Sequence, residues 1–217
     1  MKRLMQLVVL IALMPLATLS YGQIERFVAG THYTELPAPV NTVDASKVEV
    51  LEAFWYGCSH CFRFEPVVNA WKDAQPDDVE FVRFPAAWND LMRTHARIFY
   101  IIEVLGAVDT IHQEVFNAIN LQGNILQREN LIADFFEAQG VSRQQYERAA
   151  NHFHVKSSME RLSDRNADYG IRSTPNMIVN GKYLVTTGGQ VRTQEEMLEV
   201  VEFLVEKERQ SLRSSGG

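Results

Sequence analysis

The stretch EAFWYGCSHCFRFEP, residues 52–66, contains the only two cysteines of the 217-residue chain, Cys58 and Cys61. The residues that lead into it, 48–56 (VEVLEAFWY), are β-branched and aromatic, which predicts a strand. Residues 59–71 then carry apolar side chains at helical spacing. The pattern therefore places Cys58 at the N-terminus of a helix and Cys61 one turn inside it.

The position of Cys58 predicts a reactive thiolate. The first N–H groups of a helix have no backbone partner and the helix dipole is positive there, and both effects lower the pKa of a nearby thiol. A protonated His60 would add a cation between the two sulfurs. We therefore expect Cys58 to be acidic, exposed and nucleophilic, and Cys61 to be more buried and to resolve its mixed disulfides.

The start of the chain predicts export. Residues 2–3 are basic, residues 4–16 form an apolar run broken only by Gln6, and residues 20–22 place small side chains at −3 and −1 of a cleavage site. This order is typical of a signal peptide over residues 1–22, with the mature chain beginning near Gln23. A membrane anchor is the alternative, but the run of about 13 residues is shorter than the roughly 20 needed to span a bilayer.

Charge and length narrow the function classes. Without Lys2 and Arg3, 19 of the 21 basic residues remain against 27 acidic ones, a net charge of −8. No Lys/Arg-rich run is present, which argues against a nucleic-acid partner. The mature chain is long enough to bury a sizeable core, as one large domain or as a small domain with an insertion.

Three interpretations of the cysteine pair remain open in an exported protein. A structural staple gains little here, because a four-residue loop stabilises by only about 2 kcal/mol, against about 3 for 15 residues. A zinc site needs four ligands, and the chain offers two thiols with His60 between them, whereas His152 and His154 could be recruited only by an accident of folding. The third interpretation, a disulfide that opens and closes between Cys58 and Cys61, needs neither a metal nor an organic cofactor, and we favour it.

Glu52 is the unusual residue of the predicted strand. Alternation places it on one face with Val50, while both faces are largely apolar, as in a central strand. Such a carboxylate either lies near an exposed strand end or is buried beneath the site, where a raised pKa would suit it to move protons for Cys61. We favour the second interpretation, and we expect Glu49, on the opposite face, to be solvated.

The C-terminal part predicts a hairpin and a final helix. The strands are expected at residues 177–179 and 183–186, joined by the Asn-Gly turn at residues 180–181. Residues 193–196 (TQEE) form a capping-box pattern that opens the helix. We expect the tail at residues 211–217 to be disordered.

Between the two parts lies a segment with helical patterns throughout, residues 89–162. Helices are predicted over residues 89–105, 109–119, 128–139, a stretch opened by Ser142 and Gln145, and residues 157–169. We interpret the apolar residues of this segment as a core, and His95 and His112 as ordinary helix histidines.

These features together resemble the DsbA family of periplasmic thiol:disulfide oxidoreductases. The resemblance rests on the export signal, on FWYGCSHCFRFEP, on STPNMIVNGKY after the helical segment, and on GTHYTEL near the start of the mature chain. It implies an α/β thioredoxin-like fold interrupted by an all-helical domain. The implied bounds are residues 23–88 and 163–217 for the thioredoxin-like domain and 89–162 for the helical insertion.

The resemblance also implies roles for individual residues. Cys58 attacks and is attacked, Cys61 resolves, His60 helps to hold the Cys58 thiolate, and Glu52 is the buried acid beneath the site. The bond between Thr174 and Pro175 is expected to be cis and to face the disulfide, where its backbone pairs with an extended substrate.

Two departures from the usual family pattern are visible. Ser59-His60 stands between the cysteines where Pro-His is usual. Compared with proline, Ser59 gains a backbone N–H and a hydroxyl but loses the fixed φ that proline offers at the start of a helix. A lysine that the family often places near the buried acid has no clear counterpart, since the aligned region reads DDVEFVRF.

The resemblance implies a periplasmic enzyme that introduces disulfide bonds into newly exported polypeptides. Its expected partners are unfolded or folding exported chains and a membrane oxidase of the DsbB type that reoxidises it, and we expect a monomer. Two rival functions stay open at this point. The site is compatible with a disulfide isomerase or reductase, and the whole protein with a peptide-binding holdase chaperone.

Overall fold

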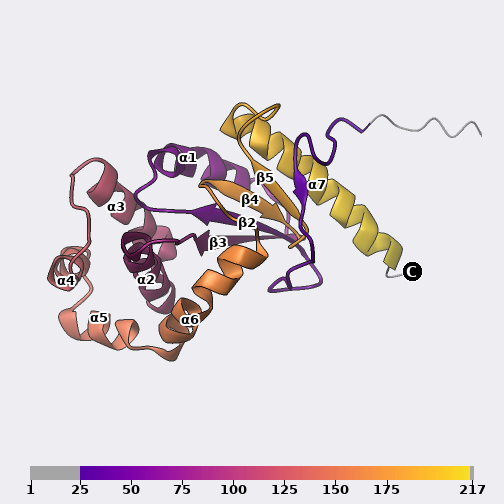
Figure 1. Ribbon diagram of the computed structural model, residues 1–217. Coiled ribbons are helices and arrows are strands. Elements are labelled where there is room, and N and C mark those ends of the chain that lie inside the picture. The colour runs from indigo at the N-terminus through magenta and orange to yellow at the C-terminus, as the bar shows by residue number, and fades with distance from the viewer. Residues whose placement is uncertain (1–24, 216–217) are drawn as a thin grey trace, which may run out of the picture.

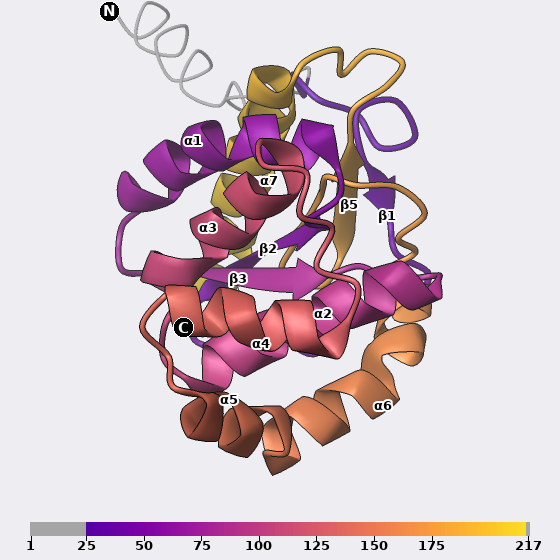
Figure 2. The ribbon, with the colours of Figure 1, turned by 90° about the vertical axis from the view of Figure 1, so that its left-hand side faces the viewer.

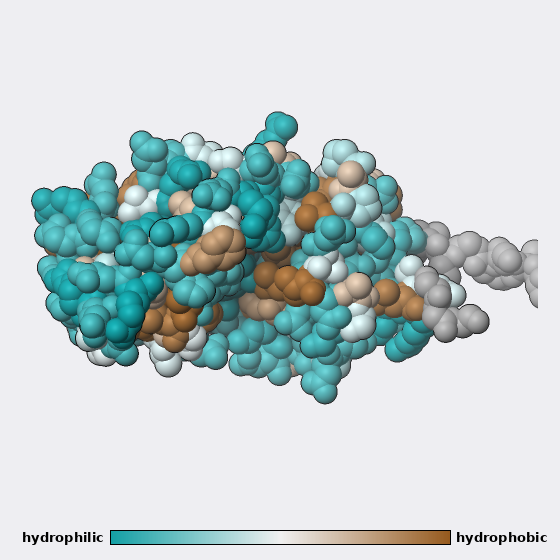
Figure 3. All heavy atoms as spheres, turned by 90° about the horizontal axis from the view of Figure 1, so that it is seen from below, coloured by the Kyte–Doolittle hydropathy of each residue, from teal (hydrophilic) through white to brown (hydrophobic). Residues whose placement is uncertain are grey.

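The computed structural model describes residues 25–215, and the predicted signal peptide lies outside them. Within the described residues, a five-stranded mixed sheet is flanked by helices (Figure 1). No helix in this part of the chain is long and apolar enough to cross a membrane. The face seen in Figure 3 is mostly hydrophilic, and its apolar side chains form separate patches.

The order of elements places a run of helices between two parts that supply the sheet. The strands are β1 (Thr34–Glu35), β2 (Val48–Phe54), β3 (Val79–Pro85), β4 (Asn176–Val179) and β5 (Tyr183–Thr186). The helices are α1 (Ser59–Asp73), α2 (Asp90–Val104), α3 (Val108–Asn120), α4 (Glu129–Ala138), α5 (Arg143–Ala150), α6 (Phe153–Asp168) and α7 (Gln194–Ser215). The sheet order is β1-β5-β4-β2-β3, so the predicted α/β fold is confirmed.

Strand β2 is central and leads directly to the cysteines. It pairs in parallel with β3 and antiparallel with β4, and all seven of its residues are buried. It ends two residues earlier than predicted, because the chain turns at Trp55, whose carbonyl accepts the N–H of Cys58 at 2.9 Å. This turn brings Cys58 to the start of α1.

The two faces of the sheet are covered by different helices. Figure 2 shows α1 and α7 on one side of the sheet and α2, with α4 to α6, on the other. Leu51 and Phe84 from the sheet share one cluster of buried residues with Ile101 and Phe136 from the helical segment. The helical segment is therefore built onto the sheet and shares its core.

Most helix boundaries in the segment agree with the sequence signals. Asn89 caps α2, and Ser142 forms a capping box that opens α5. The prediction for α6 was wrong at its start, because the side chain of His152 accepts the N–H of His154 and begins the helix four residues early. Helix α6 also runs through the predicted domain boundary at residue 162, so we propose residues 89–168 as the inserted unit.

The hairpin and the last helix follow the turn and capping signals. Asn180 and Gly181 have φ of 50° and 60°, as the tight turn requires, and a Cβ on Gly181 would lie 2.0 Å from the carbonyl oxygen of Val40. The expected disorder was wrong for residues 211–215, because α7 continues to Ser215, and residues 216–217 lie outside the described residues. A helix that packing has already formed extends at little cost, and Leu212 and Arg213 are good helix formers.

Glu49 corrects the expectation of a solvated side chain. It is only 2% exposed, and one of its oxygens accepts the N–H of Val43 at 2.8 Å. Burial raises the pKa of its carboxyl. Strand alternation indicates which face a side chain takes, but it does not show that the loop carrying Val43 covers this end of β2.

Candidate active site

Cys58 caps the N-terminus of α1 with its own sulfur. Its backbone is extended, with φ −89° and ψ 112°, and its Sγ accepts the N–H of Cys61 at 3.4 Å. Gly57 precedes it because a Cβ there would lie 2.4 Å from the ring of Trp55. The chain thus turns sharply into the helix at Cys58, and the sulfur lies half-buried at the positive end of the helix.

The two sulfurs have opposite electrostatic environments. The hydrogen bond from the Cys61 side chain, helped by the backbone N–H groups of Cys61 and His60, lowers the pKa of Cys58 to about 5, although burial opposes this. Cys61 is fully buried, and burial raises the pKa of its thiol. The predicted division into an acidic, accessible sulfur and a buried, neutral one therefore has a physical basis. Both cysteines are free thiols in this structure.

His60 supports Cys58 in a different way from the one expected. Its backbone N–H contributes to the lowered pKa of Cys58, while its exposed ring accepts a hydrogen bond from the Arg63 guanidinium at 3.1 Å from Nδ1. Its carbonyl accepts from the side chain of Gln194 at 2.8 Å, which ties the first turn of α1 to the start of α7. The main chain of His60, more than its imidazole, faces the sulfur.

The Thr174–Pro175 bond is cis, as the resemblance implied, and it lies beside Cys58. The Cys58 thiol donates to the carbonyl oxygen of Thr174 at 3.4 Å. The following Asn176 opens β4 and donates from its side chain to the carbonyl of Ser173 at 3.0 Å, which holds the loop in place. Segments more than 110 residues apart in sequence thus meet at the reactive sulfur.

Glu52 is fully buried and poorly paired. The Nε of Arg83, directly opposite on β3, lies 3.3 Å from one Glu52 oxygen, but neither oxygen has a well-aligned hydrogen bond. Burial, and then the negative charge of Glu65, raises the pKa of Glu52 to about 8. The carboxyl therefore holds a proton at neutral pH, as its predicted role requires.

Glu65 is a second buried carboxyl that the sequence analysis did not single out. It accepts hydrogen bonds from the side chains of Arg83 at 3.1 Å, Asn69 at 3.0 Å and His112 at 3.1 Å. Although burial opposes ionisation, these partners hold its pKa below the usual value. Glu65 lies four residues after Cys61, on the same face of α1. Arg83, within DDVEFVRF, takes the place near the acid for which no lysine was found.

The two buried histidines tie the helical segment to the residues just before Cys58. The Nδ1 of His112 lies 2.8 Å from the Tyr56 hydroxyl, and the Nδ1 of His95 accepts from the indole N–H of Trp55 at 3.0 Å. The Nε2 of His95 lies 2.8 Å from the carbonyl oxygen of Ile125. These pairs are invisible in sequence, because helical spacing alone makes both histidines look like ordinary core-facing residues.

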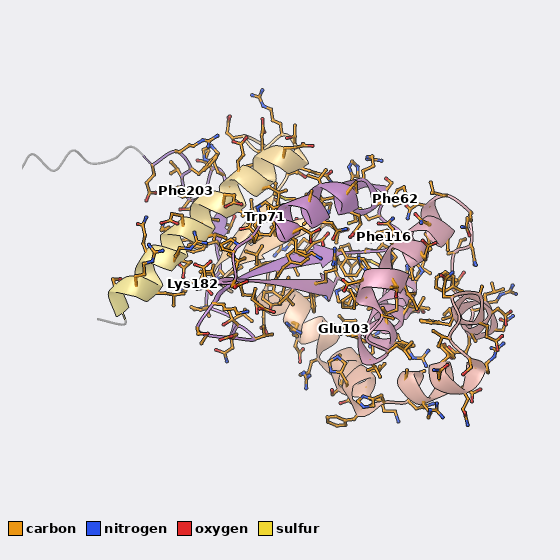
Figure 4. All side chains as sticks on the ribbon, turned by 180° about the vertical axis from the view of Figure 1, so that it is seen from behind. Phe62, Trp71, Glu103, Phe116, Lys182 and Phe203 are labelled. Carbon is orange, nitrogen blue, oxygen red and sulfur yellow. The ribbon has the colours of Figure 1, made fainter. Side chains whose placement is uncertain are left out.

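The helical segment also contacts α1 directly. Phe62 on α1 and Phe116 on α3 lie side by side, with ring centroids 6.2 Å apart (Figure 4). Within the described residues, no group of three or more His, Cys, Asp or Glu side chains is arranged to hold a metal ion.

Comparisons with known proteins match this geometry. A family model described as a DSBA-like thioredoxin domain matches residues 82–198. The thiol:disulfide interchange protein DsbA of Pseudomonas aeruginosa is 35% identical over 207 residues, which cover 94% of this chain and 98% of that protein. The DsbA of Azotobacter vinelandii is 38% identical over 183 residues, 83% of this chain and 84% of that protein.

Solved structures agree over the same length. The crystal structure of Pseudomonas aeruginosa DsbA superposes with a TM-score of 0.81 at 36% identity and covers 86% of this chain and 97% of that one. The oxidoreductase DsbA from Xylella fastidiosa superposes with a TM-score of 0.77 at 29% identity, covering 84% and 98%. The chain belongs to the DsbA family of thiol:disulfide oxidoreductases, which introduce disulfide bonds into proteins.

Proposed function

We propose that this protein oxidises newly exported polypeptides through a disulfide between Cys58 and Cys61. The proposal is carried by the contrast between the two sulfurs, since the pKa of Cys58 is lowered to about 5 while that of buried Cys61 is raised. A sulfur that is stable as a thiolate is a good leaving group. Electrons therefore stay on this protein when a client leaves with its new disulfide.

The reaction proceeds in two exchanges. A client thiolate attacks the Sγ of Cys58, the Cys58–Cys61 bond breaks, and Cys61 departs with the electron pair and takes a proton. A second client thiolate then attacks the client sulfur of the mixed disulfide, and Cys58 departs as a thiolate. The client has lost two electrons and the protein now holds them as a dithiol.

The remaining site residues bind and position. The Thr174 carbonyl is within 3.4 Å of the reacting sulfur, so the main chain before Pro175 is suited to pair with an extended client segment. The N–H of His60 stabilises the Cys58 thiolate. Glu52 supplies the proton for Cys61, a role that its burial and raised pKa support.

The expected partners follow from the disulfide exchange, and the expected compartment follows from the start of the chain. The dithiol must be reoxidised, and a membrane oxidase of the DsbB type is the expected electron acceptor. The basic, apolar and small-residue order of residues 1–22 supports export to the periplasm. We expect the protein to act as a monomer.

The reduction potential of the Cys58–Cys61 couple tests the proposal. Equilibration with glutathione should give a potential near the value of about −120 mV found for DsbA, well above the roughly −270 mV of thioredoxin. The oxidised protein should also convert a two-thiol peptide to its disulfide, and Cys58→Ser should not. A potential near that of thioredoxin would favour the reductase, and full activity of Cys58→Ser in refolding would favour the holdase.

A further inference from the structure

Two buried carboxyls, Glu52 and Glu65, share one guanidinium. Arg83 lies within ion-pair distance of both, at 3.3 Å and 3.1 Å. One cation can neutralise one carboxylate, and a second unpaired buried charge would cost several kcal/mol. The cluster therefore holds one proton, and the question is which carboxyl carries it.

The donors around the two carboxyls are unequal. Glu65 receives three hydrogen bonds, from Arg83, Asn69 and His112, whereas neither oxygen of Glu52 has one that is well aligned. Arg83 is common to both carboxyls, so it does not by itself decide between them. The donors that belong to Glu65 alone are Asn69 and His112.

The tautomer of His112 follows from its two neighbours. Ionised Glu65 only accepts, so the Nε2 of His112, 3.1 Å away, carries the proton. Burial lowers the pKa of His112, so its ring is neutral and Nδ1 is an acceptor. The Tyr56 hydroxyl, 2.8 Å from Nδ1, is buried with a raised pKa and donates. The rings of Phe54 and Phe116, both packed edge-on to the imidazole, hold this orientation.

We propose that His112 is a positioning residue that keeps the negative charge on Glu65 and thereby leaves the proton on Glu52. This inference rests on the proposed role of Glu52 as the proton donor to Cys61. When a client is oxidised, the bond between the two cysteine sulfurs breaks and Cys61 takes the proton of Glu52. The new Glu52 carboxylate then faces Arg83. His112 touches neither sulfur and acts only through Glu65.

Other titratable groups surround the cluster on several elements. They are Cys61 from α1, Tyr56 from the turn after β2, and Glu103 from α2, which acts on Tyr56 at longer range. Strand β4 places Met177, which does not titrate, opposite Glu52. Of these neighbours, Tyr56 is the one that contacts His112 directly, so its hydroxyl is part of the same unit.

Two substitutions of His112 separate the hydrogen bond that Nε2 donates to Glu65 from the other contacts of the ring. In His112→Gln the amide N–H₂ reaches the place of Nε2 and still donates to Glu65. In His112→Asn the shorter amide remains near the place of Nδ1, where it still accepts from Tyr56 but no longer reaches Glu65. Only His112→Gln thus keeps the hydrogen bond to Glu65 on which the proposal depends.

Carboxyl ¹³C NMR of the reduced protein, with Glu labelled, measures the protonation of both groups. Glu52→Gln and Glu65→Gln assign the two signals. His112→Asn should raise the titration midpoint of Glu65 by roughly 1 to 2 pH units, because a hydrogen bond to a charged group is lost, and should lower that of Glu52. His112→Gln should leave both near the wild type. Unchanged midpoints in His112→Asn, or equal shifts in both variants, would overturn the proposal.

The wild type provides a test that does not depend on the folding of a variant. Imidazole ¹⁵N NMR should show His112 neutral, with Nε2 protonated, from pH 7 to pH 8. The other tautomer, or an imidazolium in this range, would overturn the proposal.

Kinetics separate this inference from the proposed function. The rate at which the oxidised protein accepts a client thiolate should change its pH profile in His112→Asn by the shift that NMR measures for Glu52. If the carboxyl midpoints shift but the profile does not, the role of His112 in placing the proton is supported, and Glu52 is rejected as the proton donor.

Discussion

The lowered pKa of Cys58 predicts that the stability difference between the two redox forms depends on pH. In the reduced, folded protein the sulfur ionises near pH 5, whereas in the unfolded chain it ionises near its free value of about 8.5. A pKa that folding depresses gives stability that is fully present above about pH 8.5 and is lost as pH falls through the folded value. The disulfide form has no thiolate and lacks this contribution.

The size of the effect follows from the two pKa values. At pH 7 the unscreened contribution of Cys58 is about 2.7 kcal/mol, since the pH lies about two units above the folded pKa. The sulfur is only half-buried, so solvent screening reduces this to roughly 1.3 kcal/mol. The four-residue disulfide loop stabilises the oxidised form by about 2 kcal/mol. The two forms should therefore be similar in stability near pH 7.

The sign should change across the neutral range. Near pH 5 the thiolate contribution is small, and the oxidised form should be more stable by about 2 kcal/mol. The balance should then move toward the reduced form by about 0.7 kcal/mol per pH unit above the folded pKa, which is half the unscreened value. Near pH 8.5 the reduced form should be more stable by roughly 0.4 kcal/mol. Above that pH the trend should reverse, because the folded protein raises the pKa of Cys61. The Cys61 thiol then ionises only in the unfolded chain, which lowers the stability of the reduced form.

Urea unfolding of both redox forms at pH 5, 6, 7, 8 and 9 measures these differences. Groups that titrate alike in the two forms cancel when one free energy of unfolding is subtracted from the other. Cys58→Ser is the matched control, and its stability should lack the rise that the reduced wild type gains between pH 6 and 8.5. A constant advantage of about 2 kcal/mol for the oxidised form at every pH would refute the electrostatic reasoning.

Three further outcomes test other parts of the site. Cys61→Ser should accumulate mixed disulfides with clients on non-reducing gels, whereas equal trapping by Cys58→Ser would reverse the two roles. Glu52→Gln should stabilise the protein by about 1–4 kcal/mol near pH 8 in urea unfolding, and the gain should fade as pH falls from about 8 toward 4.3, below which the wild-type carboxyl is neutral in both states. Gly57→Ala should destabilise by about 1–3 kcal/mol through its clash with the Trp55 ring, and should cost little in a Trp55→Ala background.

The reactive half of the site was predictable because its chemistry is local. Cys58, Cys61 and the helix start lie within a few residues of each other, and strand and helix periodicity place them without any tertiary information. The Asn180-Gly181 turn was predictable for the same reason, since its positive φ values are a property of those residue types. Local signals determine what the backbone does, and the Cys61 thiol and the backbone N–H groups that stabilise the thiolate lie in the same helical turn as Cys58.

The buried half of the site was not predictable from such signals. Arg83, Glu65 and His112 come from β3, α1 and α3, and they meet only because strand register and helix packing bring them together. Glu65 was quoted only as part of FEP, and His112 was interpreted as an ordinary helix residue. A charged side chain in an amphipathic pattern is usually solvated, so the pattern alone predicts the wrong environment for residues such as Glu49 as well.

The buried cluster is the counterpart of the exposed thiolate. Cys58 lies at a helix terminus that stabilises negative charge, so it leaves without needing a proton. Cys61 leaves into an apolar interior where burial disfavours its anion, and solvent cannot reach it to supply a proton. A purely apolar group of side chains in place of this cluster would make the protein more stable but would contain no acid. We propose that one arginine between two carboxyls lets the cluster hold a single proton, and that Glu52, the carboxyl without aligned hydrogen bonds, is the one that releases it.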